Sequence, residues 1–218
     1  LYQRQMAYLC DHASDVYLSG AEIIDLSRDR IPRLEEVNAN LTPMTGWQSR
    51  AVPGYLKPVT FFACLSRREF PTTIVIRPRK SLDYLPEPDI FHDVFGHVPL
   101  HADPIFADFL QTYGKAALEA PPAFVEPLAR VFWFTVEFGL IQEHDELKCY
   151  GSGLISSPGE SLHALTSPDV DRRPFDLDTV CNTPFEIDHY QPILYVLESF
   201  EQLRDAMNTY ADQVLGHA

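Results

Sequence analysis

The sequence predicts a mainly α (α+β) fold, with many short helices and small peripheral β-sheets. Apolar residues recur at helical spacing in most segments, and 18 prolines divide the 218 residues into short elements. The clearest strand is Thr-Thr-Ile-Val-Ile-Arg, at residues 72–77. Because strand signals are few, we do not expect a fold built on a parallel sheet. No repeat or change in composition marks a boundary, so residues 1–218 are expected to form one domain.

The expected elements follow from this spacing and from the prolines and glycines between them. Residues 46–55, with two glycines and a proline, should form a loop and a short strand. Pro43 should end the short helix at residues 31–41. Residues 147–150 should form a strand edge before a Gly-Ser-Gly turn. The expected helices cover residues 1–10, 15–26, 31–41, 58–65, 89–97, 104–117, 122–138 and 195–214.

Composition excludes several classes of partner. The 31 acidic and 17 basic residues give a net charge of −14, which argues against nucleic acid or an anionic membrane as a partner. No apolar run approaches the roughly 18 residues of a membrane span. The first ten residues include Arg4 and no signal-like apolar block. Four scattered cysteines without a C-x-x-C pair indicate reduced thiols in the cytoplasm and no zinc-thiolate site.

Two histidines, His92 and His97, stand five residues apart in the stretch Pro-Glu-Pro-Asp-Ile-Phe-His-Asp-Val-Phe-Gly-His-Val-Pro. This spacing differs from the four-residue spacing of the H-E-x-x-H zinc motif. On an ideal α-helix the two imidazoles would point about 140° apart, at about 100° per residue. We therefore expect the helix to end between them, at Gly96, with Pro99 reinforcing the break.

A third ligand is expected at Glu137, the lone charge in the apolar run Val-Phe-Trp-Phe-Thr-Val-Glu-Phe-Gly. Burying an unpaired carboxylate costs several kcal/mol, and a metal cation offsets that cost. Two imidazoles and one carboxylate form the facial triad of Fe(II) oxygenases, with positions open for O₂ and substrate. Taken singly, each residue has an ordinary structural explanation, because histidines are often surface groups and a buried Glu often pairs with Arg. The combination favours the metal.

Three blocks of the chain resemble the pterin-dependent aromatic amino acid hydroxylases, and the likeness runs from about residue 25 to 214. They are the histidine stretch, Trp-Phe-Thr-Val-Glu-Phe-Gly-Leu, and Gly-Ser-Gly-Leu-Ile-Ser-Ser-Pro-Gly-Glu. The resemblance implies that His92, His97 and Glu137 hold Fe(II). It also implies that a tetrahydropterin reduces O₂ at the iron, and that L-phenylalanine is hydroxylated to L-tyrosine.

The resemblance implies a substrate site as well. Arg77, fifteen positions before His92, matches the Arg that binds the substrate carboxylate, and its guanidinium fork suits that role. Trp133, Ser156 and Ser157 match positions that line the substrate pocket. Ile187 matches a position that is apolar in enzymes acting on phenylalanine and Asp in those acting on tyrosine.

For the pterin, the resemblance implies that Phe70 stacks on the ring and that Asp93 lies beside it, since a carboxylate accepts hydrogen bonds from the NH-rich edge of a pterin. Phe132 stands where the family commonly has Tyr. This departure leaves the ring position open, including meta-hydroxylation of phenylalanine. Tryptophan and tyrosine also stay open as substrates.

The chain lacks the regulatory domain and the tetramerising coiled coil of the animal enzymes, and its last helix has no heptad seam. We therefore expect a monomer that takes only small-molecule substrates. Two other classes of function remain possible on sequence alone. One is a zinc hydrolase with the same ligands and Asp93 as a general base. The other is a catalytically inactive binding domain.

Overall fold

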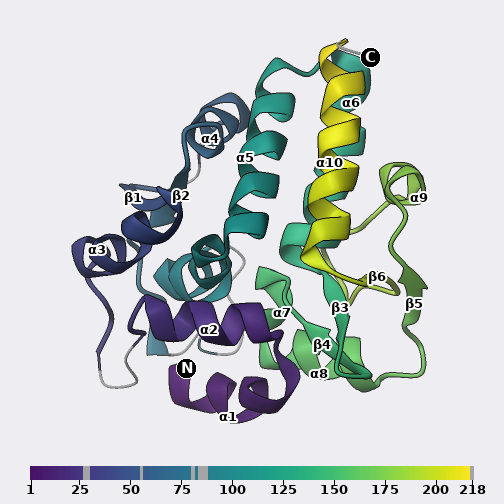
Figure 1. The fold of residues 1–218 in the computed structure, drawn as a ribbon. Helices are drawn as coiled ribbons and strands as arrows, with labels where there is room; N and C mark the ends of the chain where they lie inside the picture. Colours follow the sequence, from purple (N-terminus) through teal and green to yellow (C-terminus); the bar gives the residue numbers. More distant parts are fainter. Residues whose placement is uncertain (27–29, 55, 80–81, 83–87, 217–218) are drawn as a thin grey trace.

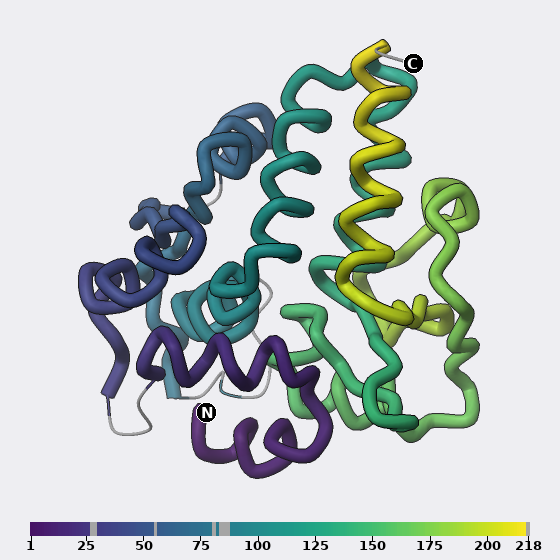
Figure 2. The backbone as a smooth tube through the Cα atoms, viewed as in Figure 1, coloured from purple at the N-terminus to yellow at the C-terminus, as the bar shows by residue number. Residues whose placement is uncertain are grey.

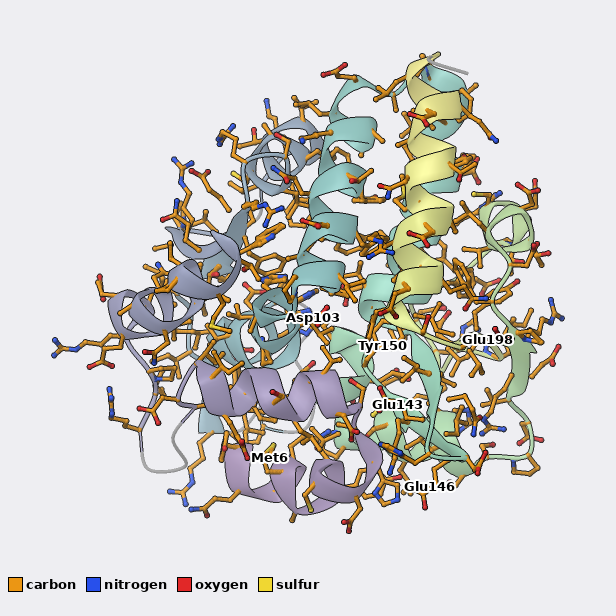
Figure 3. The ribbon with its side chains drawn as sticks, in the orientation of Figure 1. Met6, Asp103, Glu143, Glu146, Tyr150 and Glu198 are labelled. Carbon is orange, nitrogen blue, oxygen red and sulfur yellow. The ribbon has the colours of Figure 1, made fainter. Side chains whose placement is uncertain are left out.

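Two long helices, α5 (Pro104–Glu119) and α10 (Phe200–Leu215), run side by side at the centre of the fold (Figure 1). The computed structural model describes residues 1–26, 30–54, 56–79, 82 and 88–216. The Asp103 side chain, labelled in Figure 3, caps α5 by accepting a hydrogen bond from the Phe106 backbone N–H at 2.8 Å. Ser199 caps α10 in the same way. Both helices bury one apolar face, which fixes them against each other.

The other helices surround this pair, as the backbone tube in Figure 2 shows. They are α1 (Tyr2–His12), α2 (Asp15–Ile23), α3 (Leu34–Thr45), α4 (Pro58–Leu65), α6 (Pro122–Phe132), α7 (Ser152–Ser156), α8 (Pro158–Thr166) and α9 (Leu177–Asn182). The described residues also form three tighter or wider helical segments: the π-helices η2 (Phe91–His97) and η4 (Trp133–Glu137), and the 3₁₀-helix η3 (Val98–Ala102).

The strands form two small sheets. β1 (Gln48–Val52) and β2 (Glu69–Thr73) pair in parallel. The second sheet has the order β4-β3-β6-β5, made of β3 (Leu140–Glu143), β4 (Glu146–Cys149), β5 (Asp171–Pro174) and β6 (Ile193–Leu197). β6 runs parallel to both of its neighbours, and β3 and β4 form an antiparallel hairpin. Glu143 and Glu146, on either side of its turn, are labelled in Figure 3.

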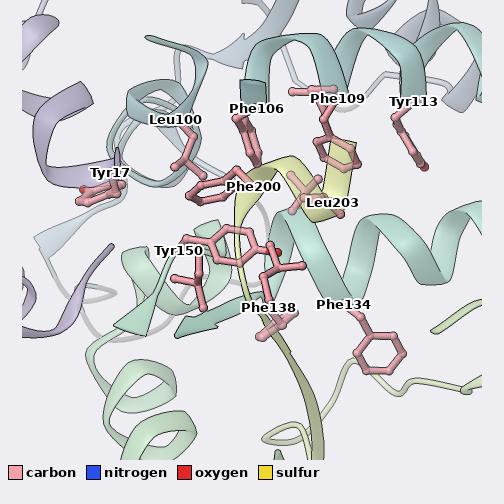
Figure 4. Close-up of a cluster of buried hydrophobic side chains, with 14 of the residues drawn as sticks. Tyr17, Leu100, Phe106, Phe109, Tyr113, Phe134, Phe138, Tyr150, Phe200 and Leu203 are labelled. Atoms are coloured by element: carbon pink, nitrogen blue, oxygen red, sulfur yellow. The ribbon is translucent and has the colours of Figure 1, made fainter. Parts of the chain in front are cut away.

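One contiguous apolar core connects these parts (Figure 4). Phe106 of α5 and Phe200 of α10 meet edge to face, with ring centroids 5.8 Å apart. Tyr150, which lies between β4 and α7, packs on Phe200 in the same manner at 5.0 Å. The core therefore fixes the start of α7, and α7 in turn packs against both π-helices.

The mainly helical class with small sheets is confirmed, and the predicted helix at 58–65 matches α4. Short strands also occur where they were expected, at β1 and β4. None of the helices in the described part of the chain has the length and apolar character that a membrane span requires.

Several predicted boundaries were wrong. Pro43 lies inside α3, which ends at Gly46 in the left-handed conformation that glycine favours. The predicted strand at 72–77 retains only Thr72 and Thr73, because β2 loses its partner where β1 ends at Val52, just before Pro53. The last helix begins at Phe200 rather than at Tyr195, which belongs to β6.

Candidate metal centre

The two π-helices carry all three predicted metal ligands. His92 and His97 lie on η2, and Glu137 is the last residue of η4. The predicted helix break at Gly96 was wrong, since the backbone at Val98 keeps right-handed helical angles and continues into η3. A π-helix bonds each N–H to the carbonyl five residues back, so its turn is wider than that of an α-helix. Residues five apart then return toward the same side, and the imidazoles converge without a break.

The structure brings the three side chains together. His97 Nε2 lies 3.2 Å from His92 Nε2 and 3.3 Å from Glu137 Oε1, and His92 Nε2 lies 3.7 Å from Glu137 Oε2. One ligand atom from each residue falls within 4.8 Å of the other two. Two ring nitrogens facing each other beside a carboxylate form a donor set that suits a divalent cation.

Electrostatics favour the metal-binding protonation states. Burial would raise the pKa of Glu137, but the charges of His97 and His92 and the hydrogen bonds from His97 and Ser152 hold it at about 2. Burial lowers the pKa of His92, which favours the neutral imidazole that a metal requires. The site therefore presents an ionised carboxylate to a neutral ring at ordinary pH.

Ser156 sets the direction of the His92 ring. Its hydroxyl donates to the Ser152 carbonyl at 2.7 Å, so its oxygen is left to accept the Nδ1–H of His92 at 2.8 Å. The proton on Nδ1 leaves the lone pair on Nε2, which faces Glu137 and His97. Ser156 was predicted in the substrate pocket, and its contacts join it to a metal ligand. Ser157, predicted beside it, caps α8 by accepting from the Glu160 N–H.

Arg77 forms a buried ion pair with Asp89. The Arg77 Nε and Nη2 groups donate to the two Asp89 carboxylate oxygens at 2.7 and 2.8 Å. The side chains of Arg77 and Asp89 are 9% and 1% exposed, so this is no surface salt bridge. Asp89 also accepts the His92 backbone N–H at 3.0 Å. The pair therefore fixes the guanidinium relative to His92, the first predicted metal ligand.

Two cavities border η2. The cavity beside the ligands has a volume of about 280 Å³ and is lined by His92, His97, Glu137, Asp93 and an aromatic wall that includes Phe61, Phe62, Phe70 and Phe132. The other, of about 440 Å³, is lined by Arg77, Asp89, Phe91, Phe95 and residues of the N-terminal helix. Among the described residues, Arg77 and Trp133 do not line the ligand-side cavity.

The two residues predicted near the pterin both border this ligand-side cavity. Phe70 is 2% exposed, and its ring centroid lies 4.6 Å from that of His97. Phe61, from α4, is only partly buried and meets Phe70 and Phe132 edge to face. Burial raises the pKa of Asp93, whose carboxylate accepts the Thr73 N–H at 2.7 Å.

Of the remaining predicted substrate residues, Trp133 begins η4 and Ile187 lies between α9 and β6. Trp133 stacks on Phe185 with centroids 4.5 Å apart, and its indole N–H donates to Gln191 at 2.9 Å. Ile187 is 76% exposed on the loop before β6, and the structure does not bring it to the other site residues that it describes. Phe138 also packs on Trp133, with ring centroids 4.6 Å apart.

Three contacting residues were missed from the sequence: Asp89, Ser152 and Phe61. Asp89 could have been predicted from the sequence, because an Asp just before a helix often accepts a hydrogen bond from a backbone N–H three residues later. Asp89 accepts the His92 N–H in this way. Ser152 and Phe61 depend on how α7 and α4 pack against the π-helices, which no local pattern reports. A second group, Glu186, Asp188 and His189, also has metal-like spacing, but all three are exposed.

A helical fold that directs two imidazoles and one carboxylate into one cavity defines a mononuclear metal enzyme of the facial-triad type. The family model for biopterin-dependent aromatic amino acid hydroxylases matches residues 1–216, and the chain belongs to that family.

Known relatives agree in sequence and structure. A phenylalanine-4-hydroxylase from Chromobacterium violaceum is 44% identical over 207 residues, which cover 94% of this chain and 70% of the relative. The apo structure of a cold-active phenylalanine hydroxylase from Colwellia psychrerythraea superposes with a TM-score of 0.95 at 42% identity, covering 99% of this chain and 82% of that one. A Chromobacterium violaceum structure with bound iron(III) and 7,8-dihydrobiopterin gives 0.92 at 43% identity, covering 100% and 80%.

Proposed function

We propose that this protein hydroxylates the ring of L-phenylalanine to give L-tyrosine, using Fe(II), O₂ and a tetrahydropterin. The observation that carries the proposal is the convergence of His92, His97 and Glu137 within 4.8 Å, in a member of this family. The relatives add support, because the sequence and structural matches named above are phenylalanine hydroxylases. One of those structures holds iron and a dihydropterin.

The three ligands fit Fe(II). Imidazole and carboxylate donors on one face are the donor set of non-haem iron oxygenases, whereas structural zinc sites are usually closed by four protein ligands. When bound, the iron and the reduced pterin together supply the electrons and the site for O₂ activation. This chain's part is to hold the ligands, orient the ring and anchor the substrate.

Arg77 is suited to anchor the substrate carboxylate. Its described hydrogen bonds use three of the five N–H groups of the guanidinium, two to Asp89 and one, from Nη1, to the Leu82 carbonyl at 3.3 Å. The fork is therefore held in place, and its other N–H groups have no hydrogen-bond partner among the residues that the structure describes, which suits them to bind a carboxylate. An anchored carboxylate keeps the aromatic ring at one distance from the reacting centre.

For the pterin, Phe61 is a second candidate stacking partner beside Phe70. Both rings line the ligand-side cavity; Phe70 is buried next to His97, whereas Phe61 is partly exposed. Asp93 lines the same cavity and can accept hydrogen bonds from a pterin edge. Trp133 remains a proposed substrate-side residue at the start of η4, whereas the exposed position of Ile187 adds no support to its predicted role.

The test is anaerobic loading with Fe(II), followed by O₂, a tetrahydropterin and phenylalanine, tyrosine or tryptophan in separate reactions. We expect para-tyrosine from phenylalanine, identified by mass and NMR. Meta-tyrosine would correct the ring position, and turnover with Zn(II) but not Fe(II) would refute the oxygenase. Glu137→Gln should abolish both iron binding and activity. Glu143→Gln, on the exposed hairpin, is the matched control and should keep both.

We also propose a cytoplasmic monomer. All four cysteines are free thiols, which supports a reducing compartment. The apolar face of α10 is buried within this chain, which supports the absence of self-association through that helix. Light scattering on the purified protein tests the oligomeric state, and a dimer mass would refute it.

A further inference from the structure

Ser152 contacts a metal ligand although nothing in the proposed reaction requires it. Its side chain is fully buried, and its Oγ lies 2.8 Å from Glu137 Oε2 and 3.2 Å from the Val136 carbonyl. A hydroxyl has one proton to donate. The ionised carboxylate is the nearer and stronger acceptor, so the proton goes to Glu137.

The Ser152 hydroxyl is not needed by its own helix. Ser152 is the first residue of α7, and the capping position belongs to Gly151, whose helix start has no side-chain cap. Its position is also tightly constrained. A Cβ on Gly96 would come within 3.0 Å of the Ser152 carbonyl oxygen and 3.2 Å of its Cβ. Ser152 is therefore wedged between η2 and η4, the two helices that carry the ligands.

This contact distinguishes the two oxygens of Glu137. Oε2 receives the Ser152 hydrogen bond, while Oε1 faces His97 Nε2 at 3.3 Å. A carboxylate can bind a metal through one oxygen or both, and a hydrogen bond to one oxygen fixes its plane. We propose that Ser152 is a positioning residue that holds the Glu137 carboxylate so that Oε1 is the oxygen offered to the metal.

Ser152 would then act together with Ser156, one turn later on α7. Ser156 donates to the Ser152 carbonyl and accepts from His92, so one short helix orients a ligand from each π-helix. The inference rests on the proposed function, because it assumes that Glu137 binds the metal. Metal-binding measurements test the proposed metal site and the role of Ser152 separately. The parent protein shows whether the site binds metal, and the Ser152 variant shows whether the hydroxyl matters for that binding.

The experiment is a Co(II) titration of the metal-free protein, followed by its visible absorption spectrum and by thermal melting with and without Co(II). Ser152→Ala removes the hydroxyl and keeps the backbone. Ser161→Ala is the matched control, because Ser161 is equally buried and its hydroxyl bonds to the Ser157 and Pro158 carbonyls rather than to a ligand. Ser152→Cys, which keeps the volume and a weak S–H donor, is carried in parallel in case the alanine variant does not fold.

We expect Ser152→Ala to bind Co(II) about tenfold more weakly, within the range for partners of metal ligands. Its visible bands should shift, the metal-induced rise in melting temperature should shrink, and Ser152→Cys should fall between alanine and the parent. Ser161→Ala should leave the bands and the affinity unchanged. Unchanged Co(II) affinity and spectrum in the Ser152 variants, or equal changes in Ser161→Ala, would overturn the inference. A parent protein that binds no Co(II) would instead refute the proposed metal site.

Discussion

The ion pair between Arg77 and Asp89 gives the sharpest prediction for stability and substrate binding together. Asp89→Asn keeps the shape of the side chain but replaces one carboxylate oxygen with an amide NH₂. That NH₂ group would face N–H groups of the Arg77 guanidinium. In the parent protein these groups donate hydrogen bonds to the two Asp89 oxygens at 2.7 and 2.8 Å. Arg77, 9% exposed, would keep its charge but lose the counterion that Asp89 provides.

The expected loss of stability is large. Breaking a buried ion pair by removing one partner costs about 3–5 kcal/mol. Because asparagine keeps one oxygen that can still accept a hydrogen bond from Arg77, we expect a loss of about 3 kcal/mol, at the lower end of this range. With an m-value of about 2 kcal/mol/M, the urea midpoint should fall by about 1.5 M. Asp171→Asn is the control, because the pair of Asp171 with Arg173 is solvent-exposed and should contribute little.

The pH dependence has a definite sign. Burial alone would raise the pKa of Asp89. The hydrogen bonds and charge of Arg77 and the hydrogen bond from the His92 N–H outweigh burial and lower this pKa below its ordinary value of 3.8. A depressed carboxyl pKa adds stability that is present above the unfolded-state pKa and is lost as pH falls through the folded-state pKa. The difference between parent and Asp89→Asn should therefore shrink below about pH 4.

Equilibrium urea unfolding of the metal-free protein and the KM for phenylalanine are the assays. A loosened guanidinium should raise KM along with the loss of stability, because the substrate anchor is no longer held rigid. A midpoint within about 0.3 M of the parent would refute the reasoning about the buried pair. An unchanged KM beside a lowered midpoint would remove Arg77 from substrate binding.

Three further changes follow from the structure. Phe61→Ala should raise the KM for the pterin about tenfold, because it removes about 1–1.5 kcal/mol of stacking. The control Phe124→Ala on α6 should leave that KM unchanged, and equal effects of the two variants would contradict the stacking role. Burial raises the pKa of Glu160 from 4.5 to about 7, so the parent should lose stability as pH rises from about 4.5 to 7. Urea titrations at several pH values should show a smaller decline for Glu160→Gln. Gly20→Ala should cost about 1–3 kcal/mol, because its Cβ would lie 2.0 Å from the carbonyl oxygen of Pro99, two residues after the second proposed histidine ligand. Gly54→Ala, with nothing within 4 Å, should change the melting temperature little.

The sequence predicted elements well where the signal is local. Residues 58–65 form α4 as expected, since a proline starts the helix and its apolar residues hold helical spacing. β5 (Asp-Arg-Arg-Pro) could not be predicted, because its strand character comes from pairing with β6, about twenty residues later. Tyr195 was assigned to a helix for the same reason: its partner Arg173 lies in another segment.

The site shows a similar division. The three residues that converge could be predicted as candidate ligands, because a lone Glu in an apolar run and a close histidine pair are chemical signals. The π-helical geometry could not, since the spacing argument assumed an ideal α-helix and needed a break that the chain does not make. Part of the histidine motif, residues 86 and 87, lies outside the described residues. Phe61 joins Phe70 at this cavity through the packing of α4, which no local pattern reports.

The two π-helices explain why the ligand spacing takes this form. A π-turn is rarely stable by itself and occurs mostly at functional sites, where surrounding contacts maintain it. Here η2 buries Val94 and Phe95, η4 buries Phe134 and Val136, and α7 packs against both. The five-residue spacing of the histidines thus matches the wider turn, while the serines of α7 orient His92 and Glu137. The apolar packing keeps the two helices in place and the hydrogen bonds direct the ligand atoms. A change at α7 should therefore affect metal binding before it affects the fold.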